Sequence, residues 1–260
     1  HVRSRRQRQM CIRDRLLTVR CPVLFVPAMH TEMWDHPATA ANVATLRAHG
    51  ATVMTPASGR LTGTDSGPGR LPDPQEISLI GELLLDRPDA LPYDLAGVRV
   101  VISAGGTREP LDPVRFLGNH SSGKQGFALA RAAAQRGATV TVVAGSTADP
   151  GDPAGVEIVR VATAEQLAVE MTKRSAESDV VIMAAAVADF RPVAVADAKI
   201  KKGQDGPAPI ELTTNPDILR GLVESRMAGQ IPAETVIVGF AAETGDETGG
   251  VLGHGRAQPA

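Results

Sequence analysis

Three observations predict an α/β fold with a doubly wound, Rossmann-like and mostly parallel sheet. From residue 98 onward, short apolar runs alternate with helical segments of about ten to fifteen residues, as right-handed crossovers in a parallel sheet require. One run, 179–185, is apolar almost throughout, which is typical of strands covered on both faces. Residues 163–166 have the sequence of a capping box, so the start of one crossover helix is well marked.

The first ninety residues predict an extension followed by a smaller α/β segment. Residues 1–20 hold seven arginines and follow no helical or strand period. We expect a disordered or non-native extension there, with a basic arm for nucleic acid as the alternative. Apolar runs at 23–26 and 51–55 are expected strands, with a helix at 35–49 between them. A second helix is expected at 73–85, where an aspartate cap precedes a proline.

A linker at 86–97 separates this segment from the rest of the chain. It holds two prolines and breaks every period, so a domain boundary is expected near residue 90. Beyond it, strands are expected at 98–103, 138–144, 157–161, 179–185, 210–213 and 235–240, and helices at 123–135, at 163–175 and after Pro216.

Composition excludes several classes of protein. The net charge of −2 gives no reason to expect nucleic acid or a membrane surface as a partner. No apolar run is long enough to span a bilayer, and the first twenty residues lack an apolar signal segment, so a cytoplasmic protein is expected. Two cysteines, and six histidines without paired ligand spacing, argue against a disulfide framework or a zinc site.

The long loop at 104–122 is the first candidate for chemistry, because ligands of doubly wound sheets bind where strands end. Gly118 and Gly123-Lys124 have the spacing of a P-loop. Gln125, however, replaces the magnesium-binding hydroxyl, and the motif does not follow its strand directly, so a Walker site is not expected.

Two parts of this loop are expected to contact a ligand instead. Gly105 and Gly106 would let the backbone approach a ligand at the end of the strand. Their structural alternative is an ordinary glycine turn. The second part is a helix start whose free N–H groups would make an anion site, formed by Ser121, Ser122, Gly123 and Lys124. The alternative is an ordinary serine cap.

Two later loops carry further candidates. Small residues after the strand at 179–185 leave room for a flat ligand, and Asp189 could bind a ribose hydroxyl or a metal. Only five of the 27 basic residues are lysines, and three of them fall at 199–202. They suit a flap over phosphates, with a solvated hairpin tip as the alternative. Phe240 could lie against a base, but a core phenylalanine is favoured for Phe240 alone.

Together these segments resemble the bacterial bifunctional family that joins phosphopantothenoylcysteine decarboxylase to phosphopantothenate–cysteine ligase in coenzyme A biosynthesis. The motifs occur in the family's order and spacing: AGGTREPLDPVRF, GNHSSGK, AAAVADFRP, KIKKG, NPDIL and VGFAAET. PAMHTEMW and GPGRLPDPQEI similarly resemble the end of the decarboxylase half. The resemblance implies a ligase domain at 91–260, preceded at 21–90 by a fragment of a flavodoxin-like flavoprotein domain, with the family's pattern truncated at both ends.

The resemblance also implies a reaction and residue roles. The ligase would join 4′-phosphopantothenate to cysteine, using CTP and Mg²⁺, through an acyl-cytidylate that Asn119 stabilises. Lys199 matches the first lysine of a phosphate-ordering flap, and the family implies a homo-oligomer. No ligand of the metal is assigned. The other positions matching nucleotide-binding residues are Met183, Ala184, Ala185, Asp189, Thr213, Thr214, Asn215, Pro216 and Phe240.

Departures from the family pattern leave other functions open. The complete decarboxylase domain would bind FMN. Here His30 stands where the family usually has asparagine, and Gly63 where it usually has a catalytic cysteine, so no decarboxylation by this chain is expected. One alternative is an inactive, truncated assembly or binding fragment. The other is a nicotinamide-dependent oxidoreductase, but its G-x-G-x-x-G and Tyr-x-x-x-Lys motifs are missing from the sequence.

Overall fold

The computed structural model describes residues 14–61, 65–148, 152–201 and 209–240. The chain divides into two compact units, His1–Leu91 and Pro92–Ala260, and each is considered by itself. Within the described ranges, no helix combines the length and the apolar character that crossing a membrane would need.

Unit 1 contains a two-stranded parallel sheet and the two expected helices. Strand β1 (Leu24–Phe25) pairs with β2 (Thr52–Val53), and α3 (Pro37–Ala48) connects them. Helix α4 (Pro74–Asp86) begins as predicted, because the Asp73 carboxylate accepts from the Gln75 N–H at 2.8 Å. A small apolar cluster holds the unit together: Met54, Ile80, Leu84 and Leu91.

The sequence did not predict three features of unit 1. Residues 14–18 form a helical turn, in which the Thr18 hydroxyl donates to the Asp14 carbonyl at 2.9 Å. A four-residue helix, α2 (Thr31–Trp34), follows His30. The glycine-rich stretch forms an antiparallel hairpin of β3 (Ala57–Arg60) and β4 (Ser66–Arg70). Gly67 and Gly69 interrupt the apolar alternation of a strand, and both are required for close packing, because a Cβ there would clash with Thr31 and with the Met29 carbonyl.

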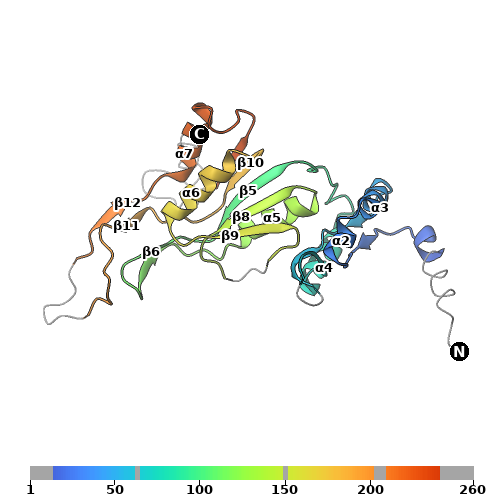
Figure 1. Ribbon diagram of the computed structural model, residues 1–260, viewed down its shortest axis with the longest axis horizontal. Coiled ribbons are helices and arrows are strands. Elements are labelled where there is room, and N and C mark those ends of the chain that lie inside the picture. The colour runs from blue at the N-terminus through green and yellow to red at the C-terminus, as the bar shows by residue number, and fades with distance from the viewer. Residues whose placement is uncertain (1–13, 62–64, 149–151, 202–208, 241–260) are drawn as a thin grey trace. The chain divides into compact units, whose positions relative to one another are not determined.

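Unit 2 is built on a five-stranded parallel sheet of order β13-β10-β5-β8-β9 (Figure 1). The chain runs outward from the central β5 to β8 and β9, and then returns to β5's other side for β10 and β13. The fold class is therefore confirmed, with a topological switch point between β5 and β10. The strands are β5 (Arg99–Ala104), β8 (Thr139–Ala144), β9 (Val156–Arg160), β10 (Val180–Met183) and β13 (Val236–Gly239).

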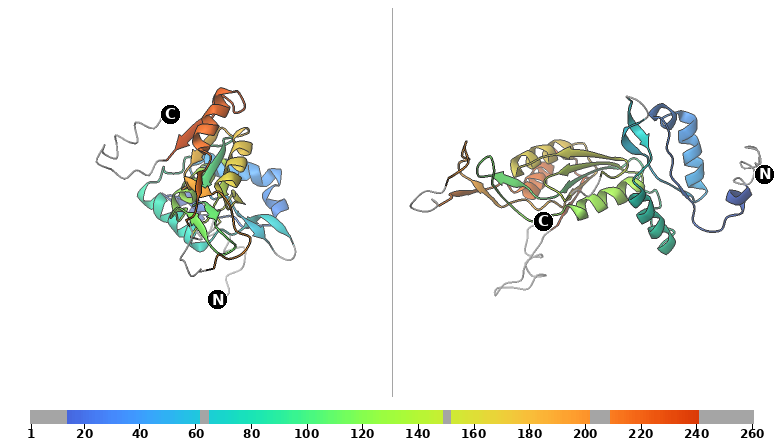
Figure 2. Two further views of the ribbon diagram at one scale, coloured as in Figure 1. Left: turned by 90° about the vertical axis from the view of Figure 1, so that its left-hand side faces the viewer. Right: turned by 90° about the horizontal axis from the view of Figure 1, so that it is seen from below.

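Helices cover both faces of this sheet (Figure 2). Helix α5 (Lys124–Gln135) packs through Phe127 on one face, in a cluster with alternate residues of β5 and β8. Helices α6 (Ala164–Ser175) and α7 (Ile218–Met227) pack on the other face. The predicted capping box starts α6, whereas Asp217 caps α7 by accepting from the Arg220 N–H.

Two antiparallel hairpins lie beyond the end of the sheet at which β5 and β10 finish (Figure 1). One pairs β6 (Arg108–Pro110) with β7 (Phe116–Gly118), and the other pairs β11 (Phe190–Pro192) with β12 (Leu212–Thr214). The strand expected at 210–213 is present as β12, but it pairs with β11 outside the parallel sheet. No helix lies between β11 and β12 within the described residues, so the chain makes a hairpin rather than a crossover.

Candidate functional site

Three loops meet at the switch point where β5 and β10 end. Gly106, just after β5, forms isolated bridges with Ser146 after β8 and with Ala186 after β10. The Gly106 N–H donates to the Ser146 carbonyl at 2.9 Å, and the Ala186 N–H donates to the Gly105 carbonyl at 2.8 Å. The ends of three adjacent strands are thus tied into one rigid edge.

The two glycines are required for this packing, as in the structural alternative of a glycine turn, and their close approach to a ligand stays a prediction. Gly105 has φ +82°, and a Cβ on it would lie 2.5 Å from the Ser146 carbonyl oxygen. A Cβ on Gly106 would lie 2.7 Å from the Asn119 carbonyl oxygen. Since the protein's own backbone fills both spaces, glycine is required there whether or not a ligand binds.

The loop after β10 is held by side chains that sequence reasoning missed. The buried Ser103 hydroxyl accepts from the N–H groups of Ala184 and Ala185, both at 3.1 Å. The buried Thr107 hydroxyl accepts from the Ala188 N–H at 2.9 Å. The signal was a hydroxyl residue at the end of an otherwise apolar strand, where a buried polar group needs a partner.

Asn119 follows β7 and joins the first loop to the second. Its exposed side-chain amide donates from Nδ2 to the Val187 carbonyl at 2.9 Å. Val187 lies four residues beyond β10, next to the predicted nucleotide-binding segment. The structure therefore brings Asn119 together with the loop that begins at Met183.

The N-terminus of α5 has fewer free N–H groups than the predicted anion site needs. Gly123, at φ +75°, is the N-cap residue and offers no side-chain cap. The Ser121 hydroxyl accepts from the Gly123 N–H and the Ser122 hydroxyl from the Lys124 N–H, both over a long 3.4 Å. The expectation of free N–H groups is corrected at these two positions, where weak serine caps occupy them.

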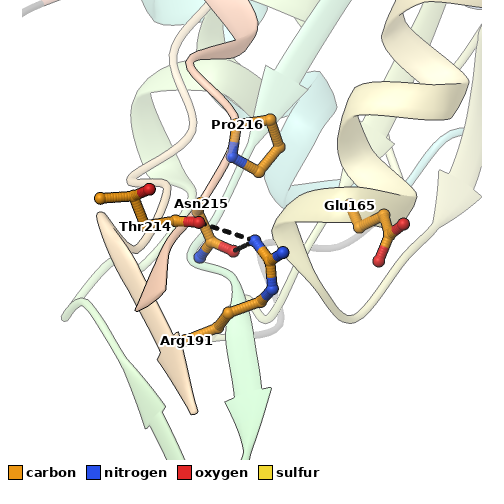
Figure 3. A pocket seen from close by; sticks show the side chains of 5 residues that line it. All are labelled: Glu165, Arg191, Thr214, Asn215 and Pro216. Carbon is orange, nitrogen blue, oxygen red and sulfur yellow. Dashed lines mark hydrogen bonds between the residues drawn. The ribbon is translucent and has the colours of Figure 1, made fainter. Parts of the chain in front are cut away.

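An open pocket of about 390 Å³ lies between the second hairpin and α6 (Figure 3). It contains three predicted nucleotide-binding residues, Thr214, Asn215 and Pro216, together with Arg191 and Glu165, which were not predicted. Arg191 extends along this wall and donates from Nη1 to the Thr214 carbonyl at 2.8 Å and to Asn215 Oδ1 at 3.1 Å. Arg191 and Glu165 thus both line this pocket.

Asp189 and Thr213 support this wall from the hairpin. Asp189 is exposed, and its carbonyl accepts from the Asn215 N–H at 2.8 Å. The Asn215 side chain donates to the Ala188 carbonyl at 2.7 Å. Thr213 pairs with Arg191 in the hairpin. These contacts join the backbone just before β11 to the backbone just after β12, and Asp189 stays exposed.

Phe240 directly follows β13 and is not a core residue, so the interpretation favoured for this residue alone was wrong. It is 48% exposed, and its N–H donates to the Met183 carbonyl at 3.1 Å. Within β13, Ile237 packs in the cluster that contains Ile218 and Leu222 of α7. Phe240 therefore lies as an exposed aromatic ring beside the end of β10.

Lys199 is exposed, and the backbone around it is held by two residues that were not predicted. Asp112, 3% exposed in the turn between β6 and β7, accepts from the Ile200 N–H at 3.1 Å. Arg115 donates from Nη2 to the Ile200 carbonyl at 2.8 Å. No sequence period marks these residues, because the contact joins segments 85 or more positions apart.

His30 belongs to unit 1, where it is half-buried and precedes α2 without capping it through its side chain. Gly63, considered for the missing cysteine, lies outside the described residues, as does Lys202. Among the residues that the structure describes, no group of three or more His, Cys, Asp or Glu side chains could hold a metal.

Comparisons with known proteins give a separate family match for each of the two parts of the chain. Residues 95–252 match the family model "DNA/pantothenate metabolism flavoprotein C-terminal domain", and residues 10–81 match the model "Flavoprotein". The coenzyme A biosynthesis bifunctional protein CoaBC of Mycobacterium tuberculosis is 65% identical over 243 residues, which cover 94% of this chain and 58% of that protein. Its namesake in Mycolicibacterium smegmatis is 63% identical, with 94% and 59% covered.

A crystal structure of the C-terminal domain of a CoaBC protein is 40% identical, covers 58% of this chain and 68% of that chain, and superposes with a TM-score of 0.48. The chain spans less than two thirds of the length of the curated relatives it matches. Because the first family model matches more than half of its residues, the chain belongs to the DNA/pantothenate metabolism flavoprotein C-terminal domain family.

Proposed function

We propose that unit 2 catalyses the CTP-dependent ligation of 4′-phosphopantothenate with cysteine, a step of coenzyme A biosynthesis. The observation that carries the proposal is the junction at the ends of β5, β10 and β13. There, Asn119 contacts the loop after β10, and Phe240 is exposed beside Met183. Relatives named for coenzyme A biosynthesis, at 65% and 63% identity, support it.

The proposed chemistry needs no covalent enzyme nucleophile. The carboxylate oxygen of 4′-phosphopantothenate attacks the α-phosphorus of CTP, a new P–O bond forms, and the bond to pyrophosphate breaks. The cysteine amine then attacks the acyl carbon of the acyl-cytidylate, loses a proton, and displaces CMP. A mixed anhydride is a far better electrophile than a carboxylate, so the energy of CTP is carried into the amide bond.

The residues have separate roles in this scheme. Asn119 uses one amide N–H for Val187, which fixes the orientation of the side chain. Its second N–H is then available to the activated intermediate, as an oriented donor for developing charge. The exposed Lys199 and Lys124 would neutralise phosphate charge. Phe240 would contact the base.

Mg²⁺ would enter with the nucleotide. Magnesium in nucleotide sites is held mainly by substrate phosphates and waters, with one or two carboxylates. The exposed carboxylate of Asp189, beside the proposed site, could be such a ligand. Among the described residues, no group of three or more His, Cys, Asp or Glu side chains could hold a metal without the nucleotide. The metal would offset charge on the phosphates.

We also propose that residues 21–90 are part of a flavodoxin-like domain that, when complete, binds FMN and decarboxylates 4′-phosphopantothenoylcysteine. The match of residues 10–81 to a flavoprotein family supports this division from residues 91–260. The described residues of unit 1 supply only two parallel strands and a hairpin, whereas a flavodoxin-like FMN site uses the ends of several strands. They do not fit FMN by themselves, and no flavin step is derived for His30.

A homo-oligomer in the cytoplasm is part of the same proposal. Apolar side chains on the two hairpins, including Phe116, Phe190 and Leu212, are about half exposed. Monomeric proteins rarely leave such clusters uncovered, so these residues support self-association through the hairpins.

Product formation tests the ligase proposal. The chain is incubated with 4′-phosphopantothenate, cysteine and Mg²⁺, with CTP, ATP or NAD as the third substrate. We expect one CMP and one pyrophosphate for each 4′-phosphopantothenoylcysteine, with CTP preferred. A chain that binds CTP but forms no product would favour the alternative of an inactive binding fragment. Product formed equally from ATP would contradict the assignment of CTP.

A further inference from the structure

Asp112 is a buried carboxylate in the turn between β6 and β7. Its side chain has no accessible surface, and it accepts from the N–H groups of Val114 at 2.8 Å and Arg115 at 2.9 Å. The Arg115 guanidinium also donates to it, from Nε at 2.9 Å and from Nη2. The Arg115 hydrogen bond keeps the pKa of the Asp112 carboxyl well below its usual range, so the group is charged at neutral pH.

The same ion pair reaches the lysine segment. Asp112 Oδ2 accepts from the Ile200 N–H at 3.1 Å, while Arg115 Nη2 donates to the Ile200 carbonyl at 2.8 Å. Both backbone groups of one residue are thus held from the other hairpin. A third hydrogen bond, from the Ala196 N–H to the Leu111 carbonyl at 3.0 Å, joins the same two segments.

Burial of side chains does not explain why this segment is ordered. Ile200 is 45% exposed, and its neighbours Lys199 and Lys201 are exposed too. Hydrogen bonds to a charged, buried partner are stronger than neutral ones and are directional. The Asp112–Arg115 pair therefore supplies the restraint that packing does not.

The charge balance of the pair leaves the lysines free for another partner. Arg115 compensates Asp112, and within the described ranges no ion pair joins Lys199 or Lys201 to a carboxylate. Arg115 lies four residues before Asn119 on the same loop. One short segment therefore fixes the backbone of the lysines and carries the amide proposed to meet the reacting group.

We propose that Asp112 and Arg115 are positioning residues, which hold residues 199–201 in register with Asn119 so that the Lys199 ammonium meets the nucleotide phosphates. The role in catalysis rests on the proposed function, while the restraint itself does not. The test therefore measures the two separately.

Trypsin cleavage of the Lys199–Ile200 bond measures the restraint, because the Ile200 N–H is the group that Asp112 binds. In Asp112→Asn, which loses the carboxylate charge, we expect cleavage at this bond to become about tenfold faster or more. Asp179→Asn is the matched control. It weakens a similar aspartate–arginine pair, with Arg99 at the amino ends of β5 and β10, and should leave this cleavage unchanged.

Arg115→Lys serves if Asp112→Asn does not fold. Lysine keeps the charge beside Asp112 but lacks the planar fork that contacts both Asp112 and Ile200. Faster cleavage at Lys199, with an unchanged thermal midpoint, is expected. Equal cleavage in the parent chain and in a folded variant would overturn the restraint.

Steady-state turnover measures the role in catalysis. For both variants we expect the KM for CTP to rise about tenfold, with kcat within about threefold of the parent, because the change affects nucleotide positioning before chemistry. Faster cleavage with an unchanged KM for CTP would overturn the positioning role. A parent chain that forms no product would contradict the proposed function and remove that role, while the cleavage rate still reports on the restraint.

Discussion

The Asn119 side-chain amide donates to the Val187 carbonyl over 2.9 Å, and so joins the loop after β5 to the loop after β10. The two residues are 68 positions apart in the chain. Their contact spans the switch point of the sheet, where α/β proteins bind ligands. An amide is suited to this place because one N–H can fix the side chain while the second N–H remains to donate to a ligand.

Asn119→Ala is expected to lower turnover by a factor of about a hundred or more, the usual loss when an oriented donor to a developing charge is removed. CTP should still bind. Asn119→Asp separates orientation from size, because a carboxylate cannot donate to Val187 and would face its carbonyl oxygen. Both variants are assayed for CTP binding and product. Turnover close to that of the parent chain in either variant would remove the role of Asn119.

Phe240 and Phe127 should differ in their effects on stability and on CTP binding. Phe127, on the buried face of α5, is 1% exposed, so Phe127→Ala should lower the free energy of unfolding by about 3–5 kcal/mol. Phe240 is 48% exposed, and Phe240→Ala should lower it by about 1 kcal/mol or less. Only Phe240→Ala should weaken CTP binding in the folded protein. Urea unfolding and CTP titration measure these effects. If Phe240→Ala greatly lowered stability without weakening CTP binding, Phe240 would be a core residue rather than a contact of the base.

Gly105 and Gly97 have almost the same φ, +82° and +83°, in different surroundings. A Cβ on Gly97 meets nothing within 4 Å, so Gly97→Ala should cost only the left-handed conformation, about 1 kcal/mol. A Cβ on Gly105 would lie 2.5 Å from the Ser146 carbonyl, which adds about 1–3 kcal/mol of overpacking. Urea unfolding measures both. Equal losses would show that the Ser146 contact is not a constraint.

The buried carboxyl of Asp112 should make the stability of the fold depend on pH in acid. Because Arg115 lowers its pKa in the folded protein, Asp112 stabilises the fold fully above the pKa of an unfolded aspartate, about 4. That contribution is lost as the pH falls from there through the lowered pKa. The stability difference between the parent chain and Asp112→Asn should therefore shrink between about pH 4 and pH 2. Urea unfolding at several pH values that gave a constant difference would contradict this.

Local signals in the sequence were enough to predict most of the fold. The aspartate before α4 and the capping box before α6 place helix starts through contacts between residues at most three positions apart. The apolar runs of β5, β8 and β10 have the composition of buried parallel strands.

The hairpins and the supports of the site were harder to predict. Strand β7 has three exposed residues, and β4 contains Gly67 and Gly69, where a Cβ would clash with Thr31 and Met29, so neither has the apolar alternation by which strands are identified. Ser103 and Asp112 each bind a backbone N–H more than eighty positions away. Such contacts leave no local period in the sequence, although the polar residue at a buried strand end was a usable signal.

Thermal unfolding of unit 2 with CTP and Mg²⁺ tests the central claim, a CTP site at the ends of β5, β10 and β13, most directly. At about a hundred times the dissociation constant, binding adds about 2.7 kcal/mol, which raises the midpoint by about 5–10 °C for a domain of this size. We predict that rise with CTP, a smaller one with ATP or NAD, and a reduced one with CTP in Phe240→Ala. Equal shifts with all three nucleotides, or no shift with CTP, would contradict the account.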